Sequence, residues 1–153
     1  MTSPETAIAG HLIDGVHDLP IRVYYEDTDF SGVVYHANYL KFFERGRSDF
    51  LRVLGVHHNE LANLPEPLAF AVVHIDIRFR APARIDDLVT VQTRPLSIKG
   101  ALFVLQQTCL LQGVAVCEAR VEVACIDLKS RPRRLPKALT ERIAACLPTE
   151  NAS

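Results

Sequence analysis

A strongly apolar helical segment at 38–54 constrains the fold more than any other feature of the sequence. Its apolar residues recur with the helical period and share one face; they are Tyr39, Phe42, Phe43, Phe50, Val53 and Leu54, with Leu40 and Leu51 widening the stripe. Gly46 lies on the same face, although a glycine inside a helix costs about 1 kcal/mol relative to alanine. The pattern predicts a buried helix, and Gly46 predicts that another backbone approaches it closely.

The segments around this helix alternate in polarity, which is typical of strands with one buried face. The predicted strands are 20–26, 70–80, 88–94, 101–112 and 115–127, and a short last helix is predicted from about Pro136 to Cys146. Because four strands follow one another without a helix between them, the order predicts an α+β domain with an antiparallel sheet. A sheet of about five strands that curls around one long helix is the hotdog architecture.

The length of 153 residues predicts one domain over 19–147, preceded by a loose arm over 1–18 and followed by a tail over 148–153. The 17 Lys and Arg against 18 Asp and Glu give a net charge of −1, which disfavours nucleic acid as a partner. The N-terminus lacks the pattern of a signal peptide, and no apolar run reaches the roughly 20 residues of a membrane span. The sequence therefore predicts a cytoplasmic domain without a membrane span.

The cysteines and histidines give no pattern of a metal site. The cysteines are Cys109, Cys117, Cys125 and Cys146. They form no C-x-x-C pair and lie in apolar surroundings, which predicts inert buried thiols. His57 and His58 are adjacent and would not share a helix face, so they do not predict a ligand pair. Neither a metal nor a cofactor is expected.

The residues that carry chemistry are concentrated between 25 and 47. Glu26, Asp27 and Asp29 lie within four residues, and Asp29 precedes the N-terminus of the buried helix. Helix N-termini present free N–H groups that stabilise a developing oxyanion, and a nearby carboxylate supplies a nucleophile or general base. The spacing alone leaves a second interpretation open, since an Asp ahead of a helix is often a cap or a turn residue.

The stretch 25–47 resembles the signature of the 4-hydroxybenzoyl-CoA thioesterase family, and it is most similar to the Tol–Pal-associated acyl-CoA thioesterase branch. The matching residues are Tyr25, Asp27, Asp29, Gly32, Val33, Val34, Tyr35, His36, Asn38, Tyr39, Phe42, Glu44 and Arg47. A weaker likeness continues to about Leu139 through segments such as F-R-A-P-A and L-P-K. The resemblance implies a hotdog fold and hydrolysis of acyl-CoA to a free acid and CoA, without a cofactor.

The same resemblance implies a role for each matching position. Asp29 matches the catalytic aspartate, and His36 matches the position whose backbone N–H polarises the thioester carbonyl. The histidine side chain is a second candidate for the chemistry. The positions assigned to substrate binding are Gly32, Val34 and Tyr35. Glu44 and Arg47 are three residues apart on the helix, which favours a structural pair.

The phosphates of CoA require Lys or Arg, and two basic segments are candidates. Lys99 precedes Gly100 between two predicted strands, where the resemblance places nucleotide contacts. The segment 129–134 contains four bases, and the sequence does not choose among them; Arg131 and Arg133 are named as the candidate contacts. This chain has Gly100 and Ala101 where some relatives carry more basic residues, so its contacts with the phosphates are expected to differ.

The partners follow from the same interpretation. Acyl-CoA is the expected substrate, and acyl carrier protein is an alternative acyl donor because it carries the same pantetheine thioester. A non-catalytic hotdog module that binds acyl-CoA or a protein is the alternative outside enzymes. The resemblance implies a homodimer or homotetramer, because a small sheet leaves an edge strand that a two-fold partner can pair.

Overall fold

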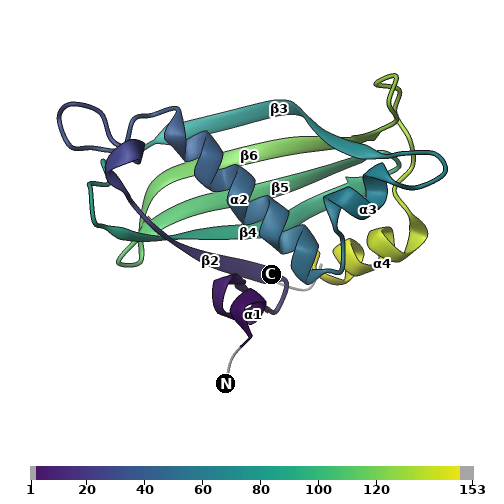
Figure 1. Cartoon of the computed structure of the whole chain (residues 1–153), viewed down its shortest axis with the longest axis horizontal. Coiled ribbons are helices and arrows are strands. Elements are labelled where there is room, and N and C mark those ends of the chain that lie inside the picture. The colour runs from purple at the N-terminus through teal and green to yellow at the C-terminus, as the bar shows by residue number, and fades with distance from the viewer. Residues whose placement is uncertain (1–2, 149–153) are drawn as a thin grey trace.

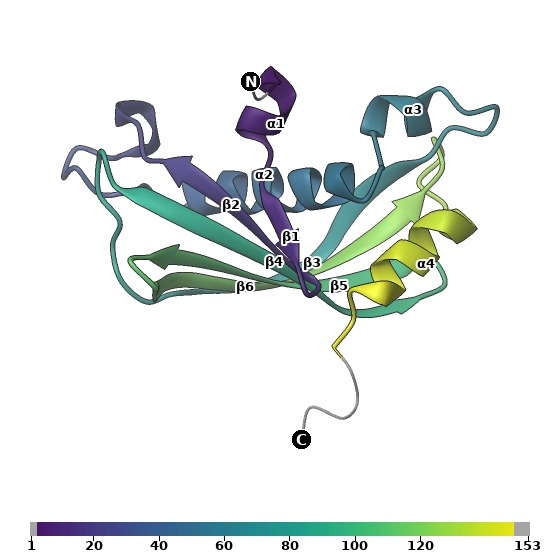
Figure 2. The same cartoon turned by 90° about the horizontal axis from the view of Figure 1, so that it is seen from below.

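A curved antiparallel sheet holds one long helix against its concave face (Figure 1). The computed structural model describes residues 3–148. Its elements are α1 (Pro4–Ile8), β1 (His11–Ile13), β2 (Val16–Arg22), the 3₁₀ helix η1 (Tyr25–Asp27), α2 (Asn38–Val53), α3 (His58–Ala62), β3 (Ala69–Phe79), β4 (Leu88–Lys99), β5 (Leu102–Leu111), β6 (Val114–Ile126) and α4 (Lys137–Ala145). The strand order β1-β2-β4-β5-β6-β3, with α2 lying along the sheet (Figure 2), confirms the predicted hotdog fold.

The α2 helix forms the centre of the core, as its apolar stripe predicts. Its buried residues are Tyr39, Phe42, Phe43, Gly46, Phe50 and Leu51. They pack on sheet residues such as Val91, Leu105 and Val121, which are also fully buried. Burying each large side chain stabilises the fold by roughly 1.5–3 kcal/mol, so this face accounts for much of the stability.

Gly46 lies at the closest approach between α2 and the sheet. A Cβ atom added there would lie 2.5 Å from Val91 Cγ1 and 3.2 Å from both Gln107 Nε2 and Thr93 Oγ1. The close approach was predicted, but the neighbours are side chains of β4 and β5 and not a backbone. Gln107 Nε2 donates 2.8 Å hydrogen bonds to Thr93 Oγ1 and to the carbonyl oxygen of Phe43. These bonds satisfy the buried amide beneath the helix.

The N-terminal region is more ordered than the loose arm predicted over 1–18. Asp14 and Gly15 have φ angles of 53° and 79°, the conformation of a type I′ turn, and they join β1 to β2 in a hairpin. The Gly10 N–H donates a 2.7 Å hydrogen bond to Asp49 Oδ2 on α2, and His17 Nε2 lies 2.7 Å from the same oxygen. The sheet therefore has six strands and not about five.

β2 ends earlier than the predicted strand 20–26. Ile21 and Val23 are buried as expected, but Tyr25 is 84% exposed. Alternation over the predicted strand 20–26 places Tyr25 on the same face as Ile21 and Val23. It does not apply here, because the chain leaves the sheet after Arg22 and turns into η1.

β3 is an edge strand whose residues do not alternate as predicted. Regular alternation over the predicted strand 70–80 places Val73 on the same face as Ile75, but a β-bulge between Val72 and His74 turns Val73 outward, where it is 56% exposed. A bulge inserts one extra residue and so reverses the alternation on one side of it. Val72 then lies on the α2 side of the sheet, opposite Val123 of β6.

β4 is longer than the predicted 88–94, because it continues past Pro95 to Lys99. Proline cannot donate to a strand ladder, so it is found at strand edges and bulges. β2 pairs with β4 only up to Thr93, and a bulge follows Pro95, so the missing N–H disrupts no ladder bond with β2. α4 packs beside this part of β4 and buries Leu139 and Ile143.

The buried cysteines agree with their predicted role as inert thiols. Cys109, Cys117 and Cys125 are buried, and the four cysteines are unpaired. Burial raises the pKa of Cys109 and of Cys117 to about 12, so both remain protonated thiols at neutral pH.

The described chain ends at residue 148, so the tail predicted over 148–153 lies almost wholly outside the described residues. Within 3–148, no helix has the length and apolar character needed to cross a membrane.

The close approach at Gly46 predicts that Gly46→Ala destabilises the protein. Alanine favours the helix by about 1 kcal/mol, but its Cβ would overlap Val91. We expect a net loss of about 1–3 kcal/mol in the free energy of unfolding, measured by urea denaturation. The loss should be smaller when Gly46→Ala is made in a Val91→Ala background. A Gly46→Ala variant as stable as the parent would contradict the proposed packing.

Candidate active site

Residues 27–35 form a short hairpin that leads into α2. The Asp29 N–H donates a 2.9 Å hydrogen bond to the Val33 carbonyl, and the Tyr35 N–H donates a 2.9 Å bond to the Asp27 carbonyl. Asp29 therefore lies on the first leg of the hairpin, and the second leg continues through Tyr35 to the helix. The hairpin brings the predicted carboxylate and the predicted N–H donors to the same end of the molecule.

Asp27 holds this hairpin in place. It is buried, and its carboxylate accepts a 2.8 Å hydrogen bond from the Tyr24 N–H. Its carbonyl oxygen also accepts a 2.7 Å bond from Asn38 Nδ2, in the first turn of α2. Through these bonds, Asp27 positions the hairpin against the helix.

Asp29 carries an ionised carboxylate with one oxygen available. Its Oδ1 accepts hydrogen bonds from the Ser31 hydroxyl at 2.5 Å and from the Ser31 N–H at 2.9 Å. These two bonds, the hydroxyl first, lower the pKa of Asp29 below its ordinary value. Among the described residues, none donates a hydrogen bond to Oδ2. That oxygen is free to act as a base or nucleophile.

The free backbone donors lie just before α2. The N–H groups of Asn38, Tyr39 and Leu40 donate to carbonyls three residues earlier, so the first turn of the helix is already bonded. Within residues 3–148, no protein acceptor pairs with the N–H of His36 or of Ala37. The donors available to a carbonyl oxygen are therefore these two, at the entry to the helix rather than inside it.

The His36 side chain lies in an exposed aromatic group. Its ring centroid is 4.5 Å from that of Tyr35 and 6.0 Å from that of Phe79, at the end of β3. Tyr35 is also exposed, so the group can contact a ligand at this surface.

The loop after β3 holds the hairpin through backbone hydrogen bonds. The Val34 N–H donates a 2.8 Å hydrogen bond to the Ala83 carbonyl, and the Ala83 N–H donates a 3.1 Å bond to the Tyr39 hydroxyl on α2. Val34 is buried, so its side chain belongs to the core. Gly32 has a φ of +82°, a conformation that favours glycine, and space around it is open.

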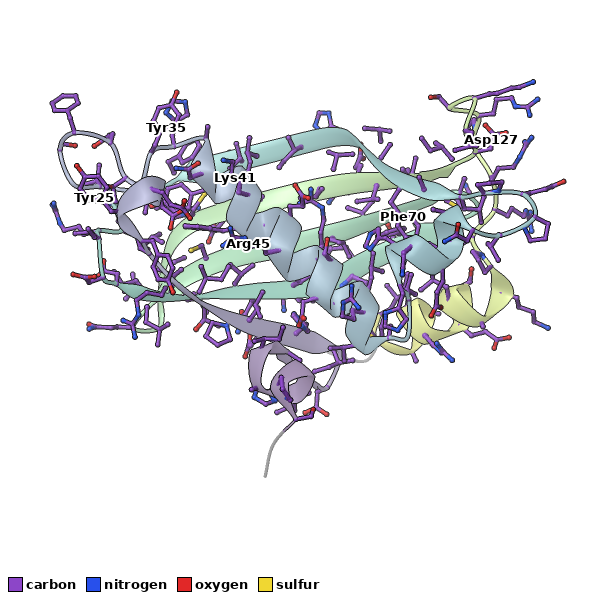
Figure 3. All side chains as sticks on the ribbon, viewed as in Figure 1. Tyr25, Tyr35, Lys41, Arg45, Phe70 and Asp127 are labelled. Atoms are coloured by element: carbon purple, nitrogen blue, oxygen red, sulfur yellow. The ribbon has the colours of Figure 1, made fainter. Side chains whose placement is uncertain are left out.

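The predicted phosphate contacts lie at the opposite end of the molecule. Figure 3 shows Tyr25 and Tyr35 at one end and Asp127 at the other. Asp127 Oδ2 lies 2.9 Å from Arg131 Nε and 2.9 Å from Arg133 Nη2. Lys99 ends β4, whose 12 residues span about 36 Å from the end nearest the hairpin. One protomer therefore does not bring these bases to Asp29.

Two contacts in these regions were not predicted. The first is the contact of Ser31 with the Asp29 carboxylate. An Asp two residues before a Ser favours a turn in which the carboxylate accepts a hydrogen bond from the residue two positions on, so the sequence contained a signal for this contact. Asp127 pairs with both Arg131 and Arg133, a contact that the basic pattern of 129–134 does not indicate.

Comparisons with known proteins agree on one family. Residues 23–143 match the family model described as "Thioesterase-like superfamily". The chain is 42% identical over 127 residues to a Haemophilus influenzae protein named "Acyl-CoA thioesterase YbgC", a match that covers 82% of this chain and 93% of that protein. It is 43% identical over 122 residues to an Escherichia coli protein named "Acyl-CoA thioester hydrolase YbgC", covering 78% and 90%. A Bartonella henselae crystal structure, described as a probable thioesterase, superposes with a TM-score of 0.77 at 50% identity and covers 79% and 99%.

The contact between Ser31 and Asp29 predicts a measurable change in acidity. Ser31→Ala removes the hydroxyl donor that favours the ionised carboxylate, so the pKa of Asp29 should rise. Ser31→Thr keeps a hydroxyl and should leave the pKa near its parent value. Carbon-detected NMR titration of the Asp29 carboxyl measures both. An unchanged pKa in Ser31→Ala would show that the hydroxyl does not bind this carboxylate in solution.

Proposed function

Because this chain belongs to the thioesterase-like superfamily, we propose that it hydrolyses acyl-CoA thioesters and that Asp29 is the catalytic carboxylate. The observation that carries the assignment is the hairpin at 27–35. It holds an ionised Asp29 with one free oxygen ahead of the unpaired N–H groups of His36 and Ala37. The names of the acyl-CoA thioesterase relatives support the substrate class.

In the proposed reaction, the thioester carbonyl oxygen lies against the N–H groups of His36 and Ala37. These donors stabilise the negative charge that develops on this oxygen when the carbonyl carbon is attacked. The C–S bond then breaks, and CoA leaves as a thiolate that takes up a proton.

Two routes fit the free oxygen of Asp29. In the first, Oδ2 attacks the carbonyl carbon and forms a mixed anhydride, which water then hydrolyses. In the second, Oδ2 takes a proton from a water molecule, which attacks the same carbon. Both routes consume one water and release the free acid and CoA. Both require the ionised carboxylate that the Ser31 hydrogen bonds favour.

We also propose that a second copy of the chain completes the site. The outer edge of β3 has no partner within the described sheet, and Phe79 and Val73 on this strand are at least half exposed. Antiparallel pairing of two β3 strands centred near His74 would set Phe79 of one copy opposite position 69 of the other. The hairpin of one copy would then lie beside the start of β3 in its partner, which supports a dimer as the smallest active unit.

This arrangement offers the phosphates of CoA a basic surface. Position 69 pairs with Ile126, and the segment with Arg131 and Arg133 follows directly. Their shared ion pairs with Asp127 hold both guanidinium groups in place, and they line a cavity with Pro65 and Leu68. We assign the phosphates to these two arginines. Lys99 ends β4, which is three positions and so about 14 Å from β3 in the sheet, and it would therefore reach only the far end of the nucleotide.

Replacement of Asp29 tests the proposed chemistry. Asp29→Asn keeps an acceptor for the Ser31 N–H but removes the base or nucleophile. We expect kcat to fall by at least about 100-fold, with little change in melting temperature or in acyl-CoA binding. Thiol release from acyl-CoA substrates of different chain lengths measures kcat.

Glu26→Gln is the matched control, because Glu26 is an exposed acid in η1, three residues before Asp29. It should retain the parent activity. An Asp29→Asn variant with close to full activity would overturn the assignment. Acyl carrier protein loaded with the same acyl groups, assayed in parallel, separates the two acyl donors.

A further inference from the structure

A small cavity lies between α2 and the sheet, on the side of β3. Its volume is about 80 Å³, and its lining includes Arg47, Leu51, His58, Phe70, Val72 and Phe103. The two phenylalanine rings pack edge to face with centroids 5.6 Å apart and form an apolar wall. The polar members of the lining are Arg47, Ser48 and His58, and Arg47 is the one that carries a permanent charge.

The guanidinium of Arg47 has few partners. Within residues 3–148, its one hydrogen bond joins Nη1 to Gln107 Oε1 at 3.5 Å, the outer limit for such a bond. Among the described residues Arg47 forms no salt bridge, and partial burial lowers its pKa, an effect that Glu44 only partly opposes. A guanidinium has five N–H donors, and a partly desolvated one is stabilised by an anion that accepts from them.

The other groups of the cavity do not supply that anion. No acidic residue is part of its lining. Burial and the nearby Arg52 lower the pKa of His58, so its imidazole is neutral at neutral pH. The cavity therefore combines one cation with apolar walls, which fits a short carbon chain that ends in a carboxylate.

The position of the cavity links it to the proposed site. Phe70 and Val72 lie at the start of β3, and pairing centred near His74 sets them opposite positions 78 and 76 of a second copy. The cavity of one copy would thus lie close to Phe79 and His36 of the other. An acyl group whose carbonyl is held at that hairpin could extend into it.

We infer that this cavity receives the far end of the acyl group and that Arg47 binds a terminal carboxylate there. The inference rests on the proposed thioesterase function and names its substrate class, the CoA thioesters of dicarboxylic acids. With a volume of about 80 Å³, the cavity is small and takes only the end of an acyl chain. The cavity would hold a carboxylate and one or two methylenes, and the remaining carbons would lead to the thioester.

A matched set of substrates tests this specificity. Glutaryl-CoA and adipoyl-CoA are compared with pentanoyl-CoA and hexanoyl-CoA, which have equal chain lengths but no carboxylate, after subtraction of spontaneous hydrolysis. The parent enzyme should have the higher kcat/KM for the carboxylated pair. Arg47→Met keeps most of the side-chain length, and it should lower kcat/KM for the carboxylated pair by roughly tenfold or more. It should change the values for the alkyl pair by less than about threefold.

Arg45→Met is the control, because it removes a charge from the exposed side of the same helix (Figure 3) and should preserve the carboxylate preference. Two results would overturn this inference but leave the proposed function in place. In the first, Arg47→Met lowers kcat/KM equally for both pairs of substrates; in the second, the parent enzyme has the higher kcat/KM for the alkyl pair. Loss of self-association in Arg47→Met by light scattering would also overturn it, since a carboxylate of the second copy would then be the partner. No turnover of any substrate by the parent would overturn the proposed function as well.

Discussion

The contact of α2 with the sheet at Gly46 is the constraint on which the remaining structure depends. Without a side chain at this position, the helix lies close enough for Gln107 to bind the Phe43 carbonyl. The same close packing buries Tyr39, whose hydroxyl accepts a hydrogen bond from the Ala83 N–H. Ala83 in turn holds Val34 and the hairpin at 27–35 that carries Asp29. The position of the candidate site therefore follows from a packing contact in the core.

The elements with a strong local signal could be predicted from the sequence. The period of 38–54 identified α2, and alternation identified five of the six strands, because these patterns reflect burial on one face. β1 was missed although Asp14-Gly15 is a hairpin signal. The face predicted for Val73 was wrong, because the alternation of polar and apolar residues does not reveal a bulge. The strand predicted to include Tyr25 ends at Arg22.

The site could be predicted in part. The resemblance singled out Asp29 and His36, and the structure places Asp29 in the hairpin at 27–35 and His36 directly after it. It did not indicate that Lys99, Arg131 and Arg133 lie at the far end of the protomer, because distance across a sheet depends on the topology. That separation is the main argument for a site assembled from two copies, in which one copy provides the hairpin and the other provides the bases.

The central claim is that the catalytic carboxylate and the phosphate contacts come from different copies. It is tested most directly by co-expressing Asp29→Asn with a triple Lys99→Ala, Arg131→Ala, Arg133→Ala variant, each with its own tag, and purifying the mixed dimer through both tags. One of its two sites would then be intact, because it combines Asp29 of the triple-variant copy with the bases of the Asp29→Asn copy. Thiol release below KM should reach about half of the parent activity, although each variant alone is nearly inactive. A mixed dimer no more active than the mean of the two variants would contradict the account.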